Sequence, residues 1–310
     1  LRTKGWEASI TWGDSFTLAS KPFNYRIMAG IGDNTSKVTK YDNPNRTLTD
    51  PYEGQQLGEI WGYVVDGYFK TDEEARNYKV DQSFVNQMIN ASALDNGLHA
   101  GDLKFVDLDG NNKIEQTTSA NDRKDMKVIG NSLPRYNYNF GISADWYGID
   151  FSVLFQGIGK QNWYPGAETS MFWGPYSRPY ASFIPSDFMS QVWSEENTGA
   201  YFPRPRGYVA LGSNRELGVV NTKYLQNLAY CRLKNLSIGY TLPDKWLSKI
   251  GFEKIRVYFS GENLLTFTKL HSDYIDPEQA SASNSWKTSK SDANIYPWAK
   301  TYSFGIDITF

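Results

Sequence analysis

The chain has 310 residues, of which 40% are hydrophobic and 15% aromatic, and its mean hydropathy is -0.54. Its 32 Lys and Arg nearly balance 34 Asp and Glu, so the broad basic surface that binds nucleic acid is absent, and we expect no nucleic-acid partner. The single cysteine, Cys231, excludes an intrachain disulfide framework. Two histidines, His99 and His271, are too few for a Cys/His zinc cluster.

Neither a transmembrane helix nor a catalytic motif is visible in the sequence. No apolar run reaches about 18 residues, the length that a membrane-spanning helix needs, but the strands of a transmembrane barrel alternate and produce no such run. G-x-S-x-G, H-E-x-x-H and Walker patterns are missing near both histidines. Glu59 and Asp66 are carboxylates of the kind that glycosidases pair, but the sequence does not give their separation. We therefore expect no enzyme.

The chain opens in a predicted strand over residues 1–13. Trp6 and Ile10 alternate there with Glu7 and Ser9, which is typical of a half-buried strand. Because neither an initiator methionine nor a secretory signal precedes this strand, we expect the chain to be a fragment of a longer protein.

The next elements are two strands and a short helix. Residues 24–32 predict a strand, and residues 60–70 predict another that glycines interrupt. Thr71, followed by Glu74, resembles a capping box and predicts a short helix within residues 71–90.

Residues 135–156 predict a tight hairpin with its turn at Tyr147 and Gly148. One face of its first strand carries rings at both ends and small aliphatic residues between them: Tyr136, Tyr138, Phe140, Ile142, Ala144 and Trp146. We interpret four polar residues of the opposite face as a wall that lines water: Asn137, Asn139, Asp145 and Gln156.

Long connections alternate with short ones in the second half of the chain. Residues 158–227 and 271–293 lack any sustained period and predict two long loops. Strands are predicted over residues 235–241 and 255–259, with a brief helix within residues 242–251 between them. Outer-membrane barrels show this asymmetry, with short periplasmic turns and long extracellular loops.

The terminal segment is the clearest strand. One face holds rings at both ends and aliphatic residues between them: Tyr302, Phe304, Ile306, Ile308 and Phe310. Aromatic residues favour the two interfaces of a membrane and aliphatic residues its hydrocarbon, so this face suits contact with lipid. The alternative is the last strand of a soluble β-sandwich, whose apolar face points into a core.

Six segments keep their order and spacing from Lys4 to Phe310: KGWEASITW, GQQLGEIWGYVVDGYFKTDEEA, GDLKFVDLDGNNKI, NDRKDMKVIGNSLPRYNYNFGISADWYGIDFSVLFQGIG, YCRLKNLSIGYTLPDKWLSKIGFEKIRVYFSGENLLTFTK and YPWAKTYSFGIDITF. Together they resemble the C-terminal part of the SusC/RagA family, the TonB-linked outer-membrane transporters of the Bacteroidetes. The resemblance is weakest over residues 162–227 and 270–294.

The resemblance implies an all-β fold, an antiparallel transmembrane β-barrel of about 22 strands with a plug in its lumen and long extracellular loops. Residues 1–310 then form the C-terminal part of the barrel, with roughly eight to twelve strands. We expect the plug and the N-terminal strands to lie outside this chain. Because an open sheet edge in lipid exposes unpaired backbone groups, the remainder of the barrel must close it.

The resemblance also implies import of glycan or peptide oligomers across the Gram-negative outer membrane. A SusD-like surface lipoprotein captures the substrate in that picture, TonB acts through the missing N-terminal part, membrane lipid surrounds the barrel, and no cofactor is required. Three alternatives stay open: a structural or adhesion barrel, a soluble secreted β-sandwich that binds or cleaves carbohydrate, and a siderophore or cobalamin receptor barrel.

An acidic loop predicts a calcium site. The candidate ligands are Asp107, Asp109, Asn111, Lys113 and Asp122. The first three stand at positions 1, 3 and 5 of an EF-hand-like pattern, and the fourth stands where a backbone carbonyl binds. The last is the closing acid of the related family's pattern if residues 117–120 are an insertion, and Glu115 is a substitute ligand. The alternative is an Asx-rich turn that needs no metal.

The first long loop carries a cluster of rings beside polar groups. Its members are Trp163, Tyr164, Phe172, Trp173, Tyr176 and Tyr180. Such rings suit contact with a substrate or a partner protein, and the alternative is that they pack the loop itself.

Overall fold

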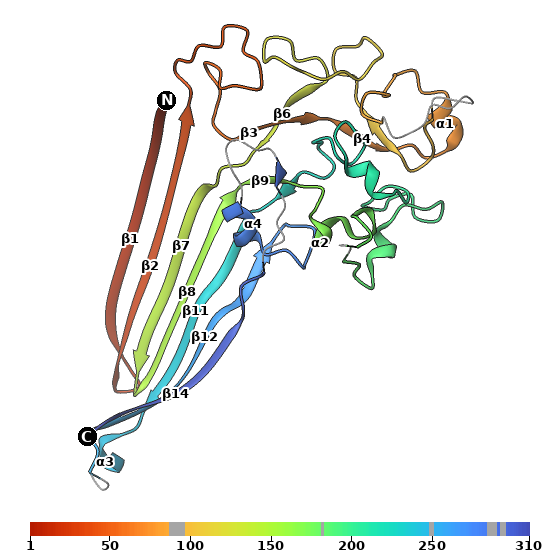
Figure 1. Cartoon of the computed structure of the whole chain (residues 1–310). Coiled ribbons are helices and arrows are strands. Elements are labelled where there is room, and N and C mark those ends of the chain that lie inside the picture. Colours follow the sequence, from red (N-terminus) through yellow and green to blue (C-terminus); the bar gives the residue numbers. More distant parts are fainter. Residues whose placement is uncertain (87–96, 181–182, 248–250, 284–289, 292–295) are drawn as a thin grey trace.

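The computed structural model describes residues 1–86, 97–180, 183–247, 251–283, 290–291 and 296–310. Its main element is an antiparallel sheet of seven strands in the order β1-β2-β7-β8-β11-β12-β14 (Figure 1). The strand bounds are β1 Arg2–Leu18, β2 Lys21–Lys37, β7 Arg135–Trp146, β8 Ile149–Lys160, β11 Tyr230–Thr241, β12 Lys254–Thr268 and β14 Thr301–Thr309. The all-β antiparallel architecture predicted from the sequence is confirmed.

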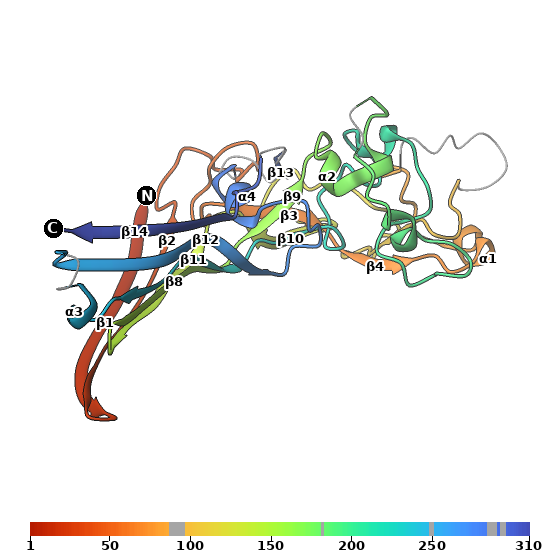
Figure 2. The same ribbon diagram turned by 90° about the horizontal axis from the view of Figure 1, so that it is seen from below.

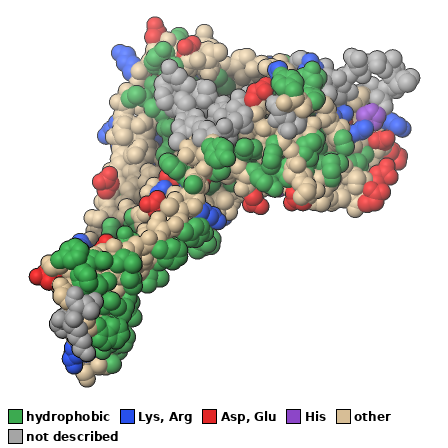
Figure 3. Space-filling view, turned by 60° about the horizontal axis from the view of Figure 1, so that its bottom comes forward, with side chains coloured by type: hydrophobic (Ala, Val, Ile, Leu, Met, Phe, Trp, Pro, Cys, Tyr) green, Lys and Arg blue, Asp and Glu red, His purple; other side chains and the backbone are tan. Residues whose placement is uncertain are grey.

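One face of this sheet is apolar across all seven strands. Residues directly opposite each other in an antiparallel pair share a face, and the register links Ile10 to Ala29, Ala29 to Phe140, and Phe140 to Phe155. We call this the apolar face, and its large members include Trp6, Ile10, Trp12, Phe16, Tyr25, Ile27, Ile31, Phe140, Ile142, Val153, Phe155, Leu236, Ile238, Val257, Phe259, Phe304, Ile306 and Ile308. Figure 3 shows hydrophobic side chains gathered along one side of the strands.

The opposite face is polar because the side-chain period of a strand is two. We call it the polar face, and its members include Glu7, Ser9, Thr11, Asn24, Asn137, Asn139, Ser143, Asp145, Ser152, Gln156, Ser237, Ser260, Ser303 and Asp307. The alternation shifts once, at the irregularity between Leu233 and Asn235, where the backbone of Asn263 on the neighbouring strand has a φ of +53°.

Short turns lie at one end of the sheet, the lower end in Figure 1. Ala19 and Ser20 join β1 to β2, and Tyr147 and Gly148 join β7 to β8. The last two residues have φ of +48° and +83°, as a two-residue hairpin turn requires. A Cβ at position 148 would lie 2.7 Å from the carbonyl oxygen of Thr241, so both backbone angle and space favour glycine there. The predicted hairpin is confirmed.

The long connections lie at the upper end of the sheet in Figure 1, which is to the right in Figure 2. They are residues 38–134, 161–229 and 269–300. They carry these smaller elements: β3 Glu59–Tyr63, β4 Val65–Tyr68, α1 Asp72–Arg76, β5 Leu103–Phe105, β6 Met126–Asn131, β9 Asn162–Pro165, α2 Ser170–Trp173, η1 Gly174–Tyr176, η2 Phe188–Gln191, η3 Tyr208–Leu211, β10 Gln226–Asn227, α4 Pro277–Ser283 and β13 Lys290–Ser291. One further helix, α3 Asp244–Leu247, lies at the lower end.

Helices are short throughout the described ranges. The hydroxyl oxygen of Thr71 accepts a hydrogen bond from the backbone N–H of Glu74 at 3.1 Å and caps α1, as predicted. The carboxylate of Glu74 accepts from the backbone N–H of Lys70 at 2.8 Å rather than from that of Thr71, so only the first half of the capping box forms. The helix has five residues, and residues 87–96 of the predicted segment lie outside the described part of the chain. Among the described residues, no helix combines the length and the apolar character needed to cross a membrane.

The buried core lies in the long connections rather than in the sheet. Its largest fully buried members are Trp163, Trp173, Tyr164, Tyr176, Tyr224, Phe105, Phe172 and Phe202. The rings pack in stacked and edge-to-face pairs, such as Phe188 and Phe202 with centroids 4.7 Å apart and Phe172 and Trp173 at 4.8 Å. The connections therefore form a packed unit of their own at the upper end of the sheet.

Several expectations differ from the structure in extent. The strands expected over residues 1–13 and 255–259 are longer, as β1 and β12. The strand expected over residues 24–32 is the 17-residue β2, and the strand expected over residues 60–70 is divided between β3 and β4. The described strands of the main sheet number seven, rather than the eight or more expected, and they form an open sheet. The alternation of polar and apolar residues reveals a strand only where the two kinds are cleanly separated. Strand ends that carry charged residues at apolar positions were therefore not predicted.

Candidate functional site

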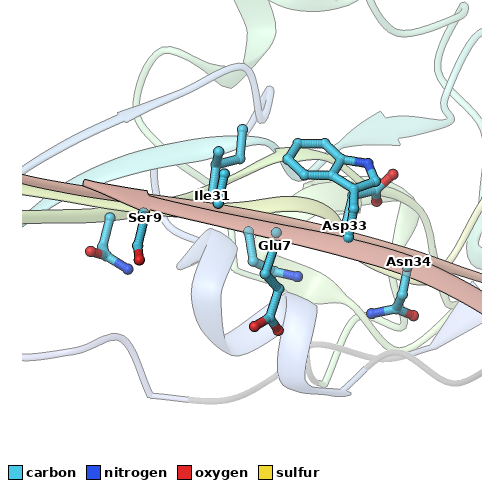
Figure 4. A pocket seen from close by; sticks show the side chains of 12 residues that line it. Glu7, Ser9, Ile31, Asp33 and Asn34 are labelled. Carbon is cyan, nitrogen blue, oxygen red and sulfur yellow. The ribbon is translucent and has the colours of Figure 1, made fainter.

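The polar face forms one continuous wall along the main sheet. An open hollow of about 740 Å³ lies over β1, β2 and β7. Figure 4 shows Glu7, Ser9 and Asn34 projecting from one side of these strands and Ile31 and Asp33 from the other.

The four residues interpreted from the sequence as wall residues lie together on the polar face. The register places Asn139 of β7 opposite Gln156 of β8. The side-chain amide of Asn24 donates to the carboxylate of Asp145 at 2.7 Å, which links β2 to β7 across this face. Such a surface of amides, hydroxyls and carboxylates suits a water-filled lumen.

An ion-pair bridge crosses the lower part of the polar face. Arg256 of β12 donates from Nε and Nη2 to the two carboxylate oxygens of Asp150 on β8, at 2.8 and 2.6 Å. Its Nη1 donates to Asp307 of β14 at 3.3 Å. Between β8 and β12 lies β11, and a Cβ at Gly239 would be 2.5 Å from both Arg256 and Asp150. Glycine at this position therefore leaves the space in which the bridge forms.

A second hollow opens among the long connections. It has a volume of about 480 Å³ and is bordered by residues 48–63 and 116–126 of the connection between β2 and β7 and by residues 213–220 before β10. Its polar lining consists of hydroxyl, amide and carboxyl groups: Thr49, Gln55, Glu59, Gln116, Thr117, Thr118, Ser213 and Asn214. Trp61 and Tyr63 add rings. Apart from Glu59, these are neutral hydrogen-bonding groups beside rings, which suit an uncharged oligomer.

The structure separates the six rings that the sequence grouped as contact residues. Trp163, Tyr164, Phe172, Trp173 and Tyr176 are at most 1% exposed and belong to the core of the connections. Two of them are held by their polar atoms: the hydroxyl of Tyr164 donates to the carbonyl of Leu217 at 2.9 Å, and that of Tyr176 to Pro203 at 2.6 Å. Because these five rings are buried, they do not contact solutes in this arrangement, and they pack the core of the connections.

Tyr180 differs from the other five because its side chain is 80% exposed. Its hydroxyl accepts a hydrogen bond from Arg178 at 2.7 Å, and Arg178 pairs with Glu168 at 3.1 Å. This exposed group of ring and charges stays a candidate for partner contact.

Two buried carboxylates share one arginine in the connections. Asp102 and Glu216 are both 0% exposed. Arg206 donates to Asp102, and its Nε lies 3.3 Å from a carboxylate oxygen of Glu216. Burial, together with the charge of Asp102, raises the pKa of Glu216 to about 7. Sequence reasoning missed this cluster because its members lie in different connections and no local motif joins them.

The acidic loop brings three carboxylates together. Oxygens of Asp107, Asp109 and Asp125 lie within 4.8 Å of one another. Two oxygens bound to one calcium ion at about 2.3–2.6 Å are at most about 5 Å apart, so these three fit one ion. Asp125 is buried and its two oxygens accept backbone N–H groups of Leu108 and Glu115 at 2.9 and 2.7 Å.

The other predicted ligands of this loop do not all converge. Asp122 is not a member of the carboxylate group, and its backbone N–H donates to the carbonyl of Ser119 at 3.1 Å. The side-chain oxygen of Asn111 accepts from the backbone N–H of Lys113 at 2.8 Å. Asp125 rather than Asp122 therefore joins Asp107 and Asp109, and local spacing in the sequence does not reveal this.

Both histidines have structural partners. The ring of His271 stacks on Tyr201 with centroids 3.5 Å apart, and its Nε2 lies 2.7 Å from the side-chain oxygen of Gln191. Burial lowers the pKa of His271. Nδ1 of His99 lies 3.7 Å from Asp72. Packing and surface pairing account for both rings.

The sheet as a whole defines a class of protein. On β14 the apolar side chains are 47–83% exposed, from Ile308 to Phe304, so no second layer among the described residues covers them. A β-sandwich would bury this face beneath another sheet. An antiparallel sheet with a bare apolar face, a polar opposite face and long loops at one end is a segment of membrane barrel wall.

Comparisons with known proteins agree with this class. No family model matches the chain. The whole chain is 26% identical to TonB-dependent receptor P3 and 25% identical to TonB-dependent receptor P39, both of Formosa agariphila, and covers 29% and 30% of those proteins. The RagAB peptide importer in its open-open state matches 99% of the chain with a TM-score of 0.62 and 19% identity, over 29% of that structure's chain. Its closed-closed state gives a TM-score of 0.60 and 20% identity.

The chain is thus SusC/RagA-like and resembles the barrel portion of TonB-dependent transporters over its full length. It spans about 30% of the length of these relatives. The relatives are named as receptors and importers rather than enzymes, which agrees with the expectation drawn from the sequence.

Proposed function

We propose that the chain forms barrel wall and extracellular loops of an outer-membrane importer that takes up peptide or glycan oligomers with energy from TonB. The observation that carries this proposal is the apolar face that extends over seven strands and is flanked by rings, with the carboxylates of Asp14 and Asp33 on β1 and β2 as interruptions. Ten residues separate Trp6 from Phe16 on β1, or about 34 Å of strand. At a tilt of about 40° this gives a height of about 26 Å, close to the apolar band of roughly 25 Å in outer-membrane barrels.

In this proposal the polar face lines the lumen and the upper connections face the outside of the cell. A SusD-like lipoprotein then covers the connections, and TonB acts through a segment outside this chain. The hollow lined by Gln55, Gln116 and Asn214 lies where an oligomer arriving from outside would first meet the chain. The matched structures are those of a peptide importer, which supports this class of substrate.

Cysteine accessibility tests which face meets lipid. In the full-length protein with Cys231→Ala, Ser152→Cys lies on the polar face and Val153→Cys on the apolar face of the same strand. In intact outer membranes we expect a water-soluble maleimide to label position 152 and a lipid-soluble probe to label position 153. The reverse pattern, or equal labelling by the soluble reagent, would contradict the barrel-wall assignment.

Substrate class is tested by what the full-length importer carries. Mass spectrometry of the protein purified from cells fed on mixed peptides and glycans should find an oligomer series of one class. Deletion of the gene should abolish growth on that class as sole nutrient, and restoration of the gene should recover it. A bound siderophore or cobalamin, with growth on both oligomer classes intact, would overturn the proposal.

We also propose that the acidic loop binds calcium through Asp107, Asp109 and Asp125. Three oxygen ligands within reach of one ion support it, and Lys113 can supply its backbone carbonyl as in EF-hand loops. Bound calcium would neutralise the three converging carboxylates and fix the loop between β5 and β6. Its role is structural, so import chemistry does not depend on a cofactor.

A further inference from the structure

A basic cluster stands at the upper edge of the apolar face. Arg2 and Lys4 of β1 and Lys37 of β2 share this face with Trp6, because the register runs without a shift from Arg2–Lys37 through Lys4–Thr35 to Trp6–Asp33. We call these three basic residues the basic rim. All three are exposed, and they border one open hollow with Thr35 and Glu53.

The basic rim has a deficit of negative charge. Within the part of the chain that the structure describes, no carboxylate lies within ion-pairing distance of Arg2, Lys4 or Lys37, and Glu53 in the same hollow forms no ion pair with them. Arg2 and Lys37 stand directly opposite each other, an arrangement that destabilises a strand pair. A bound anion would remove this repulsion.

An apolar groove continues below the basic rim on the same face. Its apolar lining alternates small and large side chains, and consists of Ala8, Ile10, Ala29, Ile31, Tyr138 and Phe140. Ala8 pairs with Ile31, and Ala29 pairs with both Ile10 and Phe140, so the two alanines create a depression between larger neighbours. Trp6 lies between the groove and the basic rim.

The heights of these features match the layers of a membrane. Lys4 and Arg2 precede Trp6 by two and four residues along β1, or roughly 5 and 10 Å towards the outside at the tilt used above. Rings such as Trp6 favour the membrane interface, where lipid headgroups lie. The groove then faces acyl chains while the basic rim faces the charged part of the headgroup.

We propose that the basic rim and the groove together bind one phosphate-bearing lipid of the outer leaflet, with the phosphate between Arg2, Lys4 and Lys37 and an acyl chain in the groove. The inference rests on the proposed membrane location of the apolar face. A free phosphate ion would occupy the basic rim but not the groove. Because only a lipid also has an acyl chain for the groove, we infer a lipid as the ligand.

The test uses the full-length transporter, purified in a neutral detergent and stripped of lipid. Thermal unfolding is followed in micelles that contain either phosphatidylglycerol or the same amount of monogalactosyl diacylglycerol, and separately with inorganic phosphate alone. We expect phosphatidylglycerol to raise the unfolding temperature, and the neutral glycolipid and inorganic phosphate to give at most a small part of that rise. The triple variant Arg2→Gln, Lys4→Gln, Lys37→Gln should lose most of the response.

A matched control removes the same charge elsewhere. Lys21→Gln, Lys79→Gln, Lys127→Gln changes three exposed lysines, of which Lys21 lies at the opposite end of the same hairpin. This variant should keep the full lipid response. Ala29→Phe, which fills the groove and leaves the charges intact, should reduce the response to phosphatidylglycerol.

Two results would overturn the proposal: an undiminished response in the triple variant of the basic rim, or a response to inorganic phosphate equal to that to phosphatidylglycerol. A full-length protein that binds the phospholipid but imports neither peptide nor glycan oligomers would contradict the proposed function alone. Labelling of position 153 by the soluble maleimide would remove the membrane location on which both depend.

Discussion

At the scale of single residues, Gly239 determines whether three strands are joined across the polar face. Arg256 reaches Asp150 over β11 only because no side chain stands at that position. The pattern of alternating residues in the sequence shows Gly239 on the polar side but says nothing about the ion pair above it. The cause is spatial: the partners come from strands about 100 residues apart, 106 in the case of Asp150 and Arg256.

We expect Gly239→Val to destabilise the full-length barrel by about 1–3 kcal/mol, because the new side chain displaces the bridge. Gly13→Val on the same face is the control, since its nearest neighbour to a Cβ is a carbonyl oxygen at 3.4 Å. Chemical unfolding in detergent measures both. In the Gly239→Val background, Arg256→Ala should cost little further stability, and a full additive loss would argue against the displaced bridge.

Glu216 is a residue whose protonation affects the stability of the connections. Its pKa is raised from 4.5 to about 7, so the folded state binds its proton more tightly than the unfolded state. Stability from this group is therefore highest below about pH 4.5, falls as the pH rises towards 7, and is constant above 7. Each pKa unit corresponds to about 1.4 kcal/mol, so the fall is on the order of a few kcal/mol.

We expect Glu216→Gln to remove this fall between pH 5 and 7, as measured by the unfolding temperature of the full-length protein at a series of pH values. Glu195→Gln, at an exposed position, is the control and should retain the wild-type profile. The charged groups that face Glu216 are Asp102 and Arg206, so Asp102→Asn should weaken the pH dependence as well. A Gln variant with the unchanged profile would refute the assignment.

At the scale of elements, predictability depends on whether the deciding pattern is local. The terminal strand and the hairpin around Tyr147 were predicted correctly because a period of two is visible within a few residues. The lower end of β1 and the upper end of β2 were not, because charged residues such as Asp14 and Lys37 interrupt the apolar pattern. In the connections, burial of rings such as Trp163 depends on contacts between distant segments, which no local period records.

The acidic loop shows that local spacing is also an incomplete guide to the residues of a proposed metal site. In the proposed calcium site, Asp107 and Asp109 follow from spacing, but the third carboxylate is the buried Asp125 rather than Asp122, which spacing favoured. We expect calcium to raise the unfolding temperature of the chelator-treated full-length protein, with about 2.7 kcal/mol of stabilisation at a concentration one hundred times Kd. Asp125→Asn should abolish the rise and Asp122→Asn should preserve it. A rise that persists in the Asp125 variant would exclude the proposed ligand set.

At the scale of the whole molecule, the two faces of the sheet differ in what they tolerate. Val153 and Ser152 are neighbours near the middle of β8, on the apolar and polar faces respectively. In the full-length protein in a bilayer, Val153→Arg should cost about 2–4 kcal/mol, because a cation near the midplane is desolvated. Ser152→Arg should cost less than 1 kcal/mol by the same measurement, since water reaches the polar face. Equal costs would mean that both faces meet the same medium.

The buried rings and the paired strands are separate packing units, and this has a consequence for descent. The strands depend on register, whereas residues 161–229 depend mainly on contacts within the connections. The long connections can therefore change in evolution to suit another nutrient while the main sheet stays the same. Among relatives that take up different nutrients, we expect the sequences of the long connections to differ more than those of the seven strands.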